Sequence, residues 1–181
     1  MGRIVITQNI TVDGVVEATD DWFSSAGSNP EADAALARER DASEGFLVGR
    51  RTFLDMRRGW RDLTDDTTGV TDHLNRVQKY VVSTTLTDPD WQHTEVLSGD
   101  LATDVGRVRA APGGDVVCTG SITLCRGLLD ADLVDELRLY VFPYARGAGR
   151  RLFDGTVPRT LALASADAFG NGVVRLVYRT T

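Results

Sequence analysis

An apolar, strand-like segment runs directly into Gly120 and Ser121, and a helix-like segment begins at Ile122. A glycine at such a junction lets a phosphate approach the backbone, and the start of a helix offers unpaired N–H groups with partial positive charge. Ser121 and Thr123 add two hydroxyl groups. The segment therefore indicates a phosphate-binding turn. A plain strand–helix junction, in which the Ser121 side chain caps the helix, explains the same residues equally well.

Two guanidinium groups follow the end of another apolar segment. Gly49, Arg50, Arg51 and Thr52 come directly after the buried-strand pattern of residues 46–48. Arginine binds phosphate through paired hydrogen bonds and keeps its charge at physiological pH. The cluster is a candidate site for the 2′-phosphate that distinguishes NADP from NAD. The alternative is an ordinary solvated pair of basic residues.

Two carboxylates, Glu31 and Asp33, open the next helix-like segment. Carboxylates in a first helical turn usually stabilise the helix dipole. A carboxylate at the mouth of a cleft can instead hydrogen-bond a heterocycle and help to protonate it, if burial raises its pKa. Asp33 is the better candidate for that role because its neighbours Ala32, Ala34 and Ala35 predict apolar surroundings.

The sequence lacks the motifs that several kinds of catalysis require. His73 and His93 are the only histidines, so H-E-x-x-H is missing, and neither G-x-S-x-G nor a Walker A motif occurs. We therefore expect no metal site, no nucleophilic serine and no phosphoryl-transfer chemistry. Cys118 and Cys125 lie in apolar surroundings and are expected to be buried, reduced thiols.

Length and composition describe one ordinary globular domain over residues 1–181. The formal charge is 20 − 26 = −6, and 42% of the residues are hydrophobic. An acidic chain without a basic stripe is a poor match for nucleic acid or for an anionic membrane. The first residues are too polar for a signal peptide, so we expect a cytoplasmic protein.

The hydrophobic pattern alternates short strands with helices and then ends in strands alone. Strands are expected at 3–10, 46–48, 80–83, 94–97, 115–119, 133–142, 160–166 and 172–180, and helices at 30–43, 100–109 and 122–129, with a short helix after 50–56. Residues 18–30 are expected to form a long loop. This order predicts an α/β fold with a mostly parallel central sheet covered on both faces and antiparallel strands at its C-terminal end.

In open sheets of this kind, ligands bind at the carboxyl ends of the strands. The segments that follow those ends are residues 13–14, 49–52, 83–84 and 120–122. We therefore expect these four loops to lie along one edge of the sheet.

Six motifs in order resemble the dihydrofolate-reductase-like superfamily, specifically stand-alone relatives of the reductase domain of riboflavin-biosynthesis proteins. They lie at residues 11–14 (T-V-D-G), 47–53 (L-V-G-R-R-T-F), 79–83 (K-Y-V-V-S), 119–121 (T-G-S), 133–137 (L-V-D-E-L) and 143–153, which includes G-A-G-R-R-L-F. The resemblance implies a three-layer α/β/α fold and NADPH as hydride donor. It also implies a homodimer, for which the aromatic residues Tyr140 and Phe142 of strand 133–142 are candidate interface residues; core packing of the same residues is the alternative.

The resemblance also assigns roles to single residues. Gly120, Ser121 and Ile122 would hold the pyrophosphate; Arg50, Arg51 and Thr52, after Gly49, would face the 2′-phosphate; Ser83 and Thr84 would face the adenosine; and Asp13 and Gly14 would border the nicotinamide and the substrate. Asp33 lies 16 residues before Gly49, about where folate-reducing members carry their helical carboxylate. Asp13 and Asp33 are therefore the candidate catalytic residues.

The leading hypothesis is an NADPH-dependent reductase of a small pteridine- or pyrimidine-like heterocycle or a related unsaturated compound. Because a fold does not determine a function, a non-catalytic nucleotide- or flavin-binding protein on the same scaffold is the alternative. An enzyme that uses a flavin or a deazaflavin is a third possibility.

Overall fold

The computed structural model describes residues 1–111 and 113–181, and all of its strands belong to one eight-stranded sheet. The strands lie in the order β4-β3-β2-β5-β1-β6-β8-β7. Their bounds are Ile4–Thr11 (β1), Ser43–Gly49 (β2), Gln78–Val82 (β3), Thr94–Leu97 (β4), Asp115–Cys118 (β5), Glu136–Phe142 (β6), Leu161–Ala168 (β7) and Val174–Thr180 (β8). The pairs from β4 to β6 are parallel, and β8 is antiparallel to β6 and to β7.

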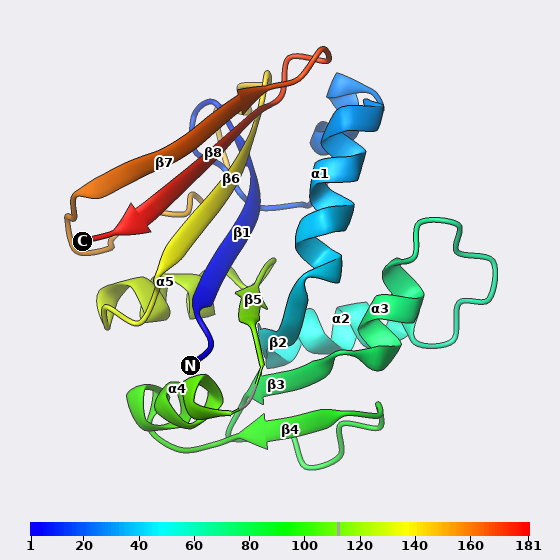
Figure 1. Ribbon diagram of the computed structural model, residues 1–181, viewed down its shortest axis with the longest axis vertical. Coiled ribbons are helices and arrows are strands. Elements are labelled where there is room, and N and C mark those ends of the chain that lie inside the picture. The colour runs from blue at the N-terminus through cyan, green and yellow to red at the C-terminus, as the bar shows by residue number, and fades with distance from the viewer. Residues whose placement is uncertain (112) are drawn as a thin grey trace.

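Helices cover both faces of this sheet, as Figure 1 shows. They are α1 (Pro30–Asp41), α2 (Arg50–Trp60), α3 (Val70–Arg76), α4 (Leu101–Ala110) and α5 (Ile122–Asp130). The first three lie on one face, and α4 and α5 lie on the other. The predicted three-layer α/β/α fold, with a mostly parallel sheet and antiparallel C-terminal strands, is confirmed.

Side-chain alternation along the strands divides the core between the two faces. On β2, Leu47 joins the large cluster under α4 and α5, whereas Phe46 and Val48 join a second cluster under α2 and α3. Successive side chains of a strand point to opposite faces, so one short apolar run supplies both layers. The same alternation places Ile4 and Ile6 of β1 in the α4–α5 cluster.

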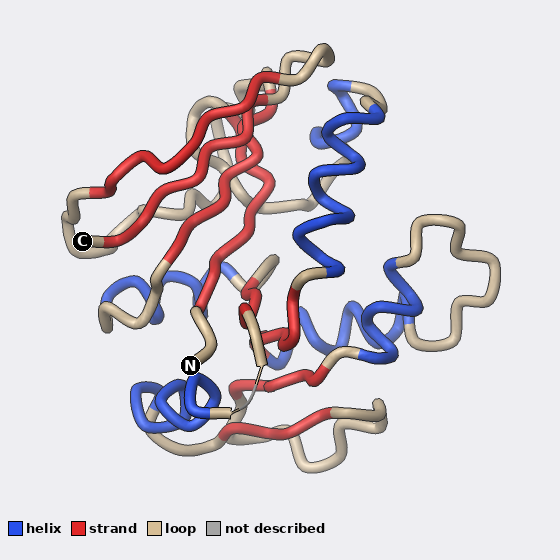
Figure 2. Tube along the Cα trace, in the orientation of Figure 1, coloured by secondary structure: helices blue, strands red, loops and turns tan. Residues whose placement is uncertain are grey.

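Three local features differ from the sequence prediction. Helix α3 was not predicted because it is short and polar; the Asp66 carboxylate accepts hydrogen bonds from the N–H groups of Thr68 and Thr71 at its start. Helix α2 extends to Trp60, and the loop that follows projects from the body of the protein (Figure 2). A 3₁₀ turn, Trp22–Ala26, interrupts the expected loop 18–30 because Trp22 is buried.

Strand 133–142 was expected to have one wetter face and to offer an interface, and both expectations are wrong. The strand begins at Glu136 and lies between β1 and β8, so neither of its edges is free. Tyr140 is 1% exposed and Phe142 is 9% exposed, and both pack in a cluster with Trp22. The charged residues that made the strand look amphipathic, Glu136 and Arg138, are buried and bond each other.

Candidate functional site

The carboxyl ends of two neighbouring parallel strands, β2 and β5, open into one cleft of about 600 Å³. We call it the phosphate cleft. Helices α2 and α5 both begin at its wall. Its lining comprises residues 16–19, 49–52, Asp55, Met56, Trp60, 120–124 and Arg150. Two of the four predicted loops, 49–52 and 120–122, therefore meet in one cavity.

Ser121 joins these two loops directly. Its hydroxyl oxygen accepts a hydrogen bond from the backbone N–H of Gly49 at 3.0 Å, and Thr52 Oγ1 donates to the carbonyl of Gly120 at 3.3 Å. Ser121 occupies the N-cap position of α5, as the alternative interpretation had it, but its side chain makes no capping hydrogen bond, because its hydroxyl bonds Gly49, 72 residues away. Neither α2 nor α5 has a side-chain cap, so the N–H groups of both first turns are left for another acceptor.

Three guanidinium groups stand around these two helix starts. Arg50 and Arg51 are exposed, and among the described residues no ion pair joins either of them to a carboxylate. Arg150 reaches the cleft from the other side and donates to Thr123 Oγ1 at 2.9 Å. Arg150 was not among the site residues predicted from the sequence, although it lies in the glycine-rich motif of residues 143–153. The positive charge and the free N–H groups together favour an anionic ligand.

Asp13 does not line the phosphate cleft, but its hydrogen bonds fix the backbone segment that leads to Arg150. One carboxylate oxygen accepts from Thr11 Oγ1 at 2.5 Å and from the Arg146 N–H at 3.1 Å, and the other accepts from the Gly147 N–H at 2.8 Å. These bonds lower the pKa of Asp13 to about 2. The carboxylate is therefore ionised at neutral pH, and it ties the turn at Gly14 to the segment that carries Arg150.

Ser83 and Thr84 lie at the same edge of the sheet but are not part of the cleft lining. Val82 is in register with Gly49, which places Ser83 beside the start of α2. The Ser83 hydroxyl accepts from the N–H groups of Thr85 and Leu86 and so closes its own turn. The structure thus places residues 83–84 beside the backbone at the start of α2 rather than in the lining.

Asp33 is exposed on α1, and it lines none of the described cavities. The flanking alanines did not predict its surroundings, because Ala32 and Ala35 face the sheet while Asp33 points away from it. The α1 carboxylate that does reach the interior is Glu39, whose side chain is 13% exposed. Sequence reasoning missed Glu39 because rotation of the helix decides which of its acids is turned inward.

A mostly apolar cavity of about 260 Å³ adjoins the phosphate cleft, and we call it the apolar cavity. Its lining comprises Thr7, Leu36, Glu39, Arg40, Ser43, Phe46, Met56, Trp60, Val70, His73, Leu74, Val117 and Thr119. Met56 and Trp60 line both spaces, and Thr119 precedes Gly120 of the cleft. Two molecules bound in these spaces would therefore touch a common wall. In the sequence, Trp60 is the one aromatic residue in the charged stretch of residues 57–70, and this was the available signal that it has a structural or binding role.

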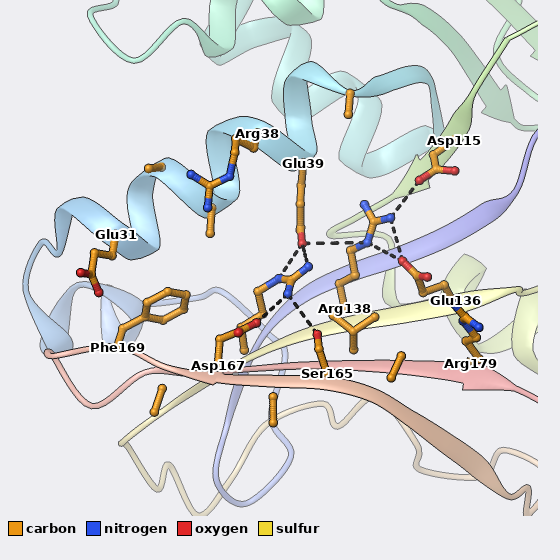
Figure 3. A pocket seen from close by; sticks show the side chains of 18 of the residues that line it. Glu31, Arg38, Glu39, Asp115, Glu136, Arg138, Ser165, Asp167, Phe169 and Arg179 are labelled. Carbon is orange, nitrogen blue, oxygen red and sulfur yellow. Dashed lines mark hydrogen bonds and ion pairs between the residues drawn. The ribbon is translucent and has the colours of Figure 1, made fainter.

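A third hollow, an open groove of about 1260 Å³, separates α1 from β7 and β8 (Figure 3). The charged side chains at its floor are paired: Arg138 donates to Glu136 at 2.7 Å and to Asp115 at 2.8 Å, and Arg175 donates to Glu39 and Asp167. At its rim, Glu31, Arg38 and Arg179 are exposed and form no ion pair among the described residues. Glu39 lies between the groove and the apolar cavity.

Within the described residues there is no cluster of three or more potential metal-ligating His, Cys, Asp or Glu side chains, and no helix is long and apolar enough to cross a membrane. Cys118 and Cys125 are buried free thiols, with their sulfur atoms 3.5 Å apart. Cys118 ends β5 and Cys125 lies on α5, and both belong to the core cluster under α4 and α5.

Comparison with known proteins shows that the chain is similar to one protein family along nearly its whole length. A family model described as the RibD C-terminal domain matches residues 3–175. The uncharacterized protein YyaP of Bacillus subtilis is 27% identical over 183 residues, which cover 97% of this chain and 94% of that protein.

Solved structures share the fold at lower identity. A putative riboflavin biosynthesis protein from Shewanella sp. PV-4 has a TM-score of 0.80 at 18% identity and covers 99% of both chains. A pyrimidine reductase-like protein from Corynebacterium diphtheriae has a TM-score of 0.71 at 13% identity, covering 99% of this chain and 92% of that one. The Thermotoga maritima deaminase/reductase has a TM-score of 0.69 at 15% identity, and 57% of that longer chain is covered.

Proposed function

This chain belongs to the RibD C-terminal domain family, and we propose that it is an NADPH-dependent reductase of a small pteridine- or pyrimidine-like ring. The observation that carries the proposal is the phosphate cleft. Two helix starts without side-chain caps open into it, and three guanidinium groups surround it. This combination suits a dinucleotide with several phosphates better than it suits an uncharged ligand.

The residues of the cleft fit such a cofactor. The N–H groups of Gly120 and Ile122 would bind the pyrophosphate, with Arg150 beside them. The Ser121 N–H donates to the carbonyl of Thr119 at 2.8 Å, so the hydroxyl of Ser121 would make its contact with the pyrophosphate. Arg50, Arg51 and Thr52 would bind the 2′-phosphate, and the neighbouring turn at Ser83 and Thr84 would border the adenosine. Bound there, NADPH would supply a hydride, and the protein would contribute alignment and exclusion of water.

The apolar cavity is the place we assign to the substrate. It shares Met56 and Trp60 with the cleft, so these two side chains would contact cofactor and substrate together. Asp13 is ionised and bound to backbone N–H groups, so we propose for it the positioning of the 146–151 segment rather than proton donation. Asp33 is solvent-exposed and outside both spaces, so we propose no contact between it and the ring.

Titration calorimetry with NADPH and with NADH tests the proposal. We expect NADPH to bind more tightly, and we expect Arg51→Ala to weaken NADPH about tenfold or more, because a charge-assisted bond to phosphate contributes about 1.5–3 kcal/mol. The affinity for NADH should change little. Arg38→Ala, which removes an exposed arginine of α1 outside the cleft, is the matched control.

Three results would count against this function. No binding of NADPH at millimolar concentration removes the cofactor, and equal losses for NADPH and NADH in Arg51→Ala remove the 2′-phosphate role. Binding of NADPH without its oxidation across a panel of heterocycles favours the alternative of a non-catalytic binding protein. A yellow purified protein would point to a flavin or a deazaflavin instead.

A further inference from the structure

The two cysteines of the chain stand on either side of the turn that forms the phosphate cleft. Cys118 is the last residue of β5, and Cys125 lies near the start of α5. Gly120 and Ser121 of the cleft lining lie between them. The two sulfur atoms are 3.5 Å apart, about 1.5 Å more than the length of a disulfide bond. A bond between these sulfur atoms would therefore need only a small movement, and it would close a loop around the turn.

The two sulfur atoms differ in the hydrogen bonds that they receive. The side-chain amide of Gln8 donates to Cys125 Sγ at 3.3 Å, and the thiol of Cys118 lies where it can donate to the same atom. The contact with Cys118 and, to a smaller extent, that with Gln8 lower the pKa of Cys125, although burial acts in the opposite direction. The thiolate is the nucleophilic form of cysteine. Cys125 is therefore the sulfur that reacts first with an oxidant, and Cys118 is the second thiol beside it.

The start of α5 connects this pair of thiols to the phosphate cleft. Both cysteines are 0% exposed, so an oxidant that reaches them must be about as small as hydrogen peroxide. Ile122 lines the cleft and also belongs to the buried cluster that contains both cysteines. Helix α5 begins without a side-chain cap, and helix ends open locally at a low cost in free energy. A local opening at Ile122 admits a peroxide from the cleft to the sulfur atoms.

We propose that Cys118 and Cys125 form a reversible disulfide with hydrogen peroxide as the oxidant, and that this disulfide weakens ligand binding in the phosphate cleft. In the first step, Cys125 sulfur attacks one peroxide oxygen. The S–O bond forms, the O–O bond breaks, and the leaving hydroxide takes the proton of the Cys125 thiol and becomes water. In the second step, Cys118 sulfur attacks the sulfur of this sulfenic acid. The S–S bond forms, the S–O bond breaks, and the second hydroxide leaves as water with the Cys118 proton. Two electrons pass from the two sulfur atoms to the peroxide.

The disulfide would act on the cleft through Ser121. Strand β5 is held between β2 and β1, so most of the movement that closes the bond falls on the start of α5. The carbonyl of Ser121 accepts from the Cys125 N–H at 2.8 Å, and the Ser121 hydroxyl accepts from Gly49. A shift of α5 therefore displaces the N–H groups of the turn and its link to the loop of residues 49–52. Formation of the disulfide does not depend on the proposed function, whereas its effect on NADPH rests on it.

Mass analysis after treatment with peroxide tests the disulfide. Both cysteines lie in one tryptic peptide, residues 110–126, and the chain has no other cysteine. We expect this peptide to lose about 2 Da on oxidation and to regain them with dithiothreitol. A peptide that does not lose this mass overturns the proposal.

Two single variants test the order of attack. In Cys118→Ala, the remaining Cys125 should react with peroxide and be labelled by dimedone, which traps sulfenic acids. In Cys125→Ala, the remaining thiol should stay unlabelled. Stronger labelling of Cys125→Ala than of Cys118→Ala overturns the assignment of Cys125 as the attacking sulfur.

Calorimetry with NADPH on the reduced, oxidised and re-reduced protein tests the effect on the cleft. We expect oxidation to weaken NADPH binding about fivefold or more, because a misplacement of about 1 Å is costly at a binding site, and we expect dithiothreitol to restore it. Met56 also lines the cleft and can be oxidised by peroxide, but dithiothreitol does not reverse a methionine sulfoxide. Cys125→Ala keeps Met56 and is the matched control, in which no reversible loss should occur. An unchanged affinity of the oxidised protein, or an equal reversible loss in Cys125→Ala, overturns the effect on the cleft.

Inorganic pyrophosphate, used in place of NADPH, separates the two proposals. If NADPH does not bind but pyrophosphate binds the reduced protein more tightly than the oxidised protein, the proposed reductase fails while the control of the cleft stands. If NADPH binds both forms equally, the reductase stands and the control fails. Failure of both ligands to bind at millimolar concentration overturns both proposals.

Discussion

At Gly120, both the backbone conformation and the space available to a ligand require the absence of a side chain. Its φ is +66°, and a Cβ there would lie 3.2 Å from Cγ2 of Thr52. Glycine reaches this conformation without strain, and it leaves room beside the first N–H groups of α5. The phosphate cleft thus depends on the absence of a side chain at this position as well as on the charges around it.

We therefore expect Gly120→Ala to lower the free energy of unfolding by about 1 kcal/mol or more, because alanine is strained at positive φ. NADPH affinity should fall in the same variant. Urea unfolding and calorimetry measure the two effects. Gly59→Ala is the control: Gly59 lies inside α2, a Cβ there meets nothing within 4 Å, and the change should be neutral or slightly stabilising. A Gly120→Ala protein as stable as the unaltered chain would contradict this account.

The lowered pKa of Asp13 predicts that the stability of the fold depends on pH. Its folded pKa, about 2, is below the ordinary value of 3.8, so its hydrogen bonds stabilise the fold above about pH 4. That contribution is lost as the pH falls from about 4 towards 2. Asp13→Asn should therefore flatten the stability profile in this window, as followed by urea unfolding at several pH values. Asp154→Asn changes an exposed carboxylate that makes no hydrogen bond in the described part of the chain, and it should leave the profile unchanged. An unaltered profile in Asp13→Asn would contradict the role of these bonds.

At the scale of elements, a group of paired charges joins α1 to the sheet. Arg138 of β6, which is 7% exposed, bonds Glu136 and Asp115 and lies 4.0 Å from Glu39 of α1 (Figure 3). Arg175 of β8 binds the same oxygen of Glu39. These contacts set the rotation of α1, and that rotation turns Glu39 inward and Asp33 outward.

Loss of Arg138 should be costly because its carboxylate partners are part-buried. Arg3 also binds Asp115 at 2.7 Å and Glu136 at 3.0 Å, so both carboxylates keep one counter-ion in the variant. We expect Arg138→Leu to lower the free energy of unfolding by about 1.5–3 kcal/mol, the usual contribution of hydrogen bonds between charged groups. Arg58→Leu removes an exposed pair with Asp55 and should change stability by less than about 1 kcal/mol. Urea denaturation of both variants checks the difference, and equal small effects would show that the pairs around Arg138 do not support the fold.

At the scale of the whole molecule, the parallel sheet places the phosphate cleft and the apolar cavity side by side. The carboxyl ends of β2 and β5 open the cleft, while α1, α2 and α3 close the cavity beside it. Helix α2 is common to both, since its start faces the cleft and its last turns, with Met56 and Trp60, form the shared wall. A change at either of these two side chains should therefore affect cofactor and ring binding together.

The homodimer stays a prediction, and its interface must lie elsewhere than β6. Strand β7 is one of the two edge strands of the sheet, and Leu163 on it is 58% exposed. Such edges commonly pair with another chain. We expect a dimer in sedimentation at micromolar concentration and a monomer for Leu163→Arg. Val157→Arg, also 58% exposed but outside β7, should remain dimeric. A monomeric unaltered protein would reject the prediction.

Local patterns sufficed to predict the sheet and the turns at its edge. Short apolar runs that end in Gly49 and Gly120 specify strand–turn–helix junctions, because glycine and helix-start chemistry act within a few residues. Parallel strands then bring such junctions to one edge, whatever their distance in the chain. The phosphate cleft, with residues 49–52 and 120–122, was therefore accessible from the sequence.

Only the tertiary structure decided which side chains meet. The partner of the Ser121 hydroxyl is 72 residues away, Glu39 rather than Asp33 is turned inward, and β6 with Tyr140 lies inside the sheet. Each of these outcomes depends on helix rotation and strand order. Packing between distant segments sets both, and the propensities of neighbouring residues do not encode them.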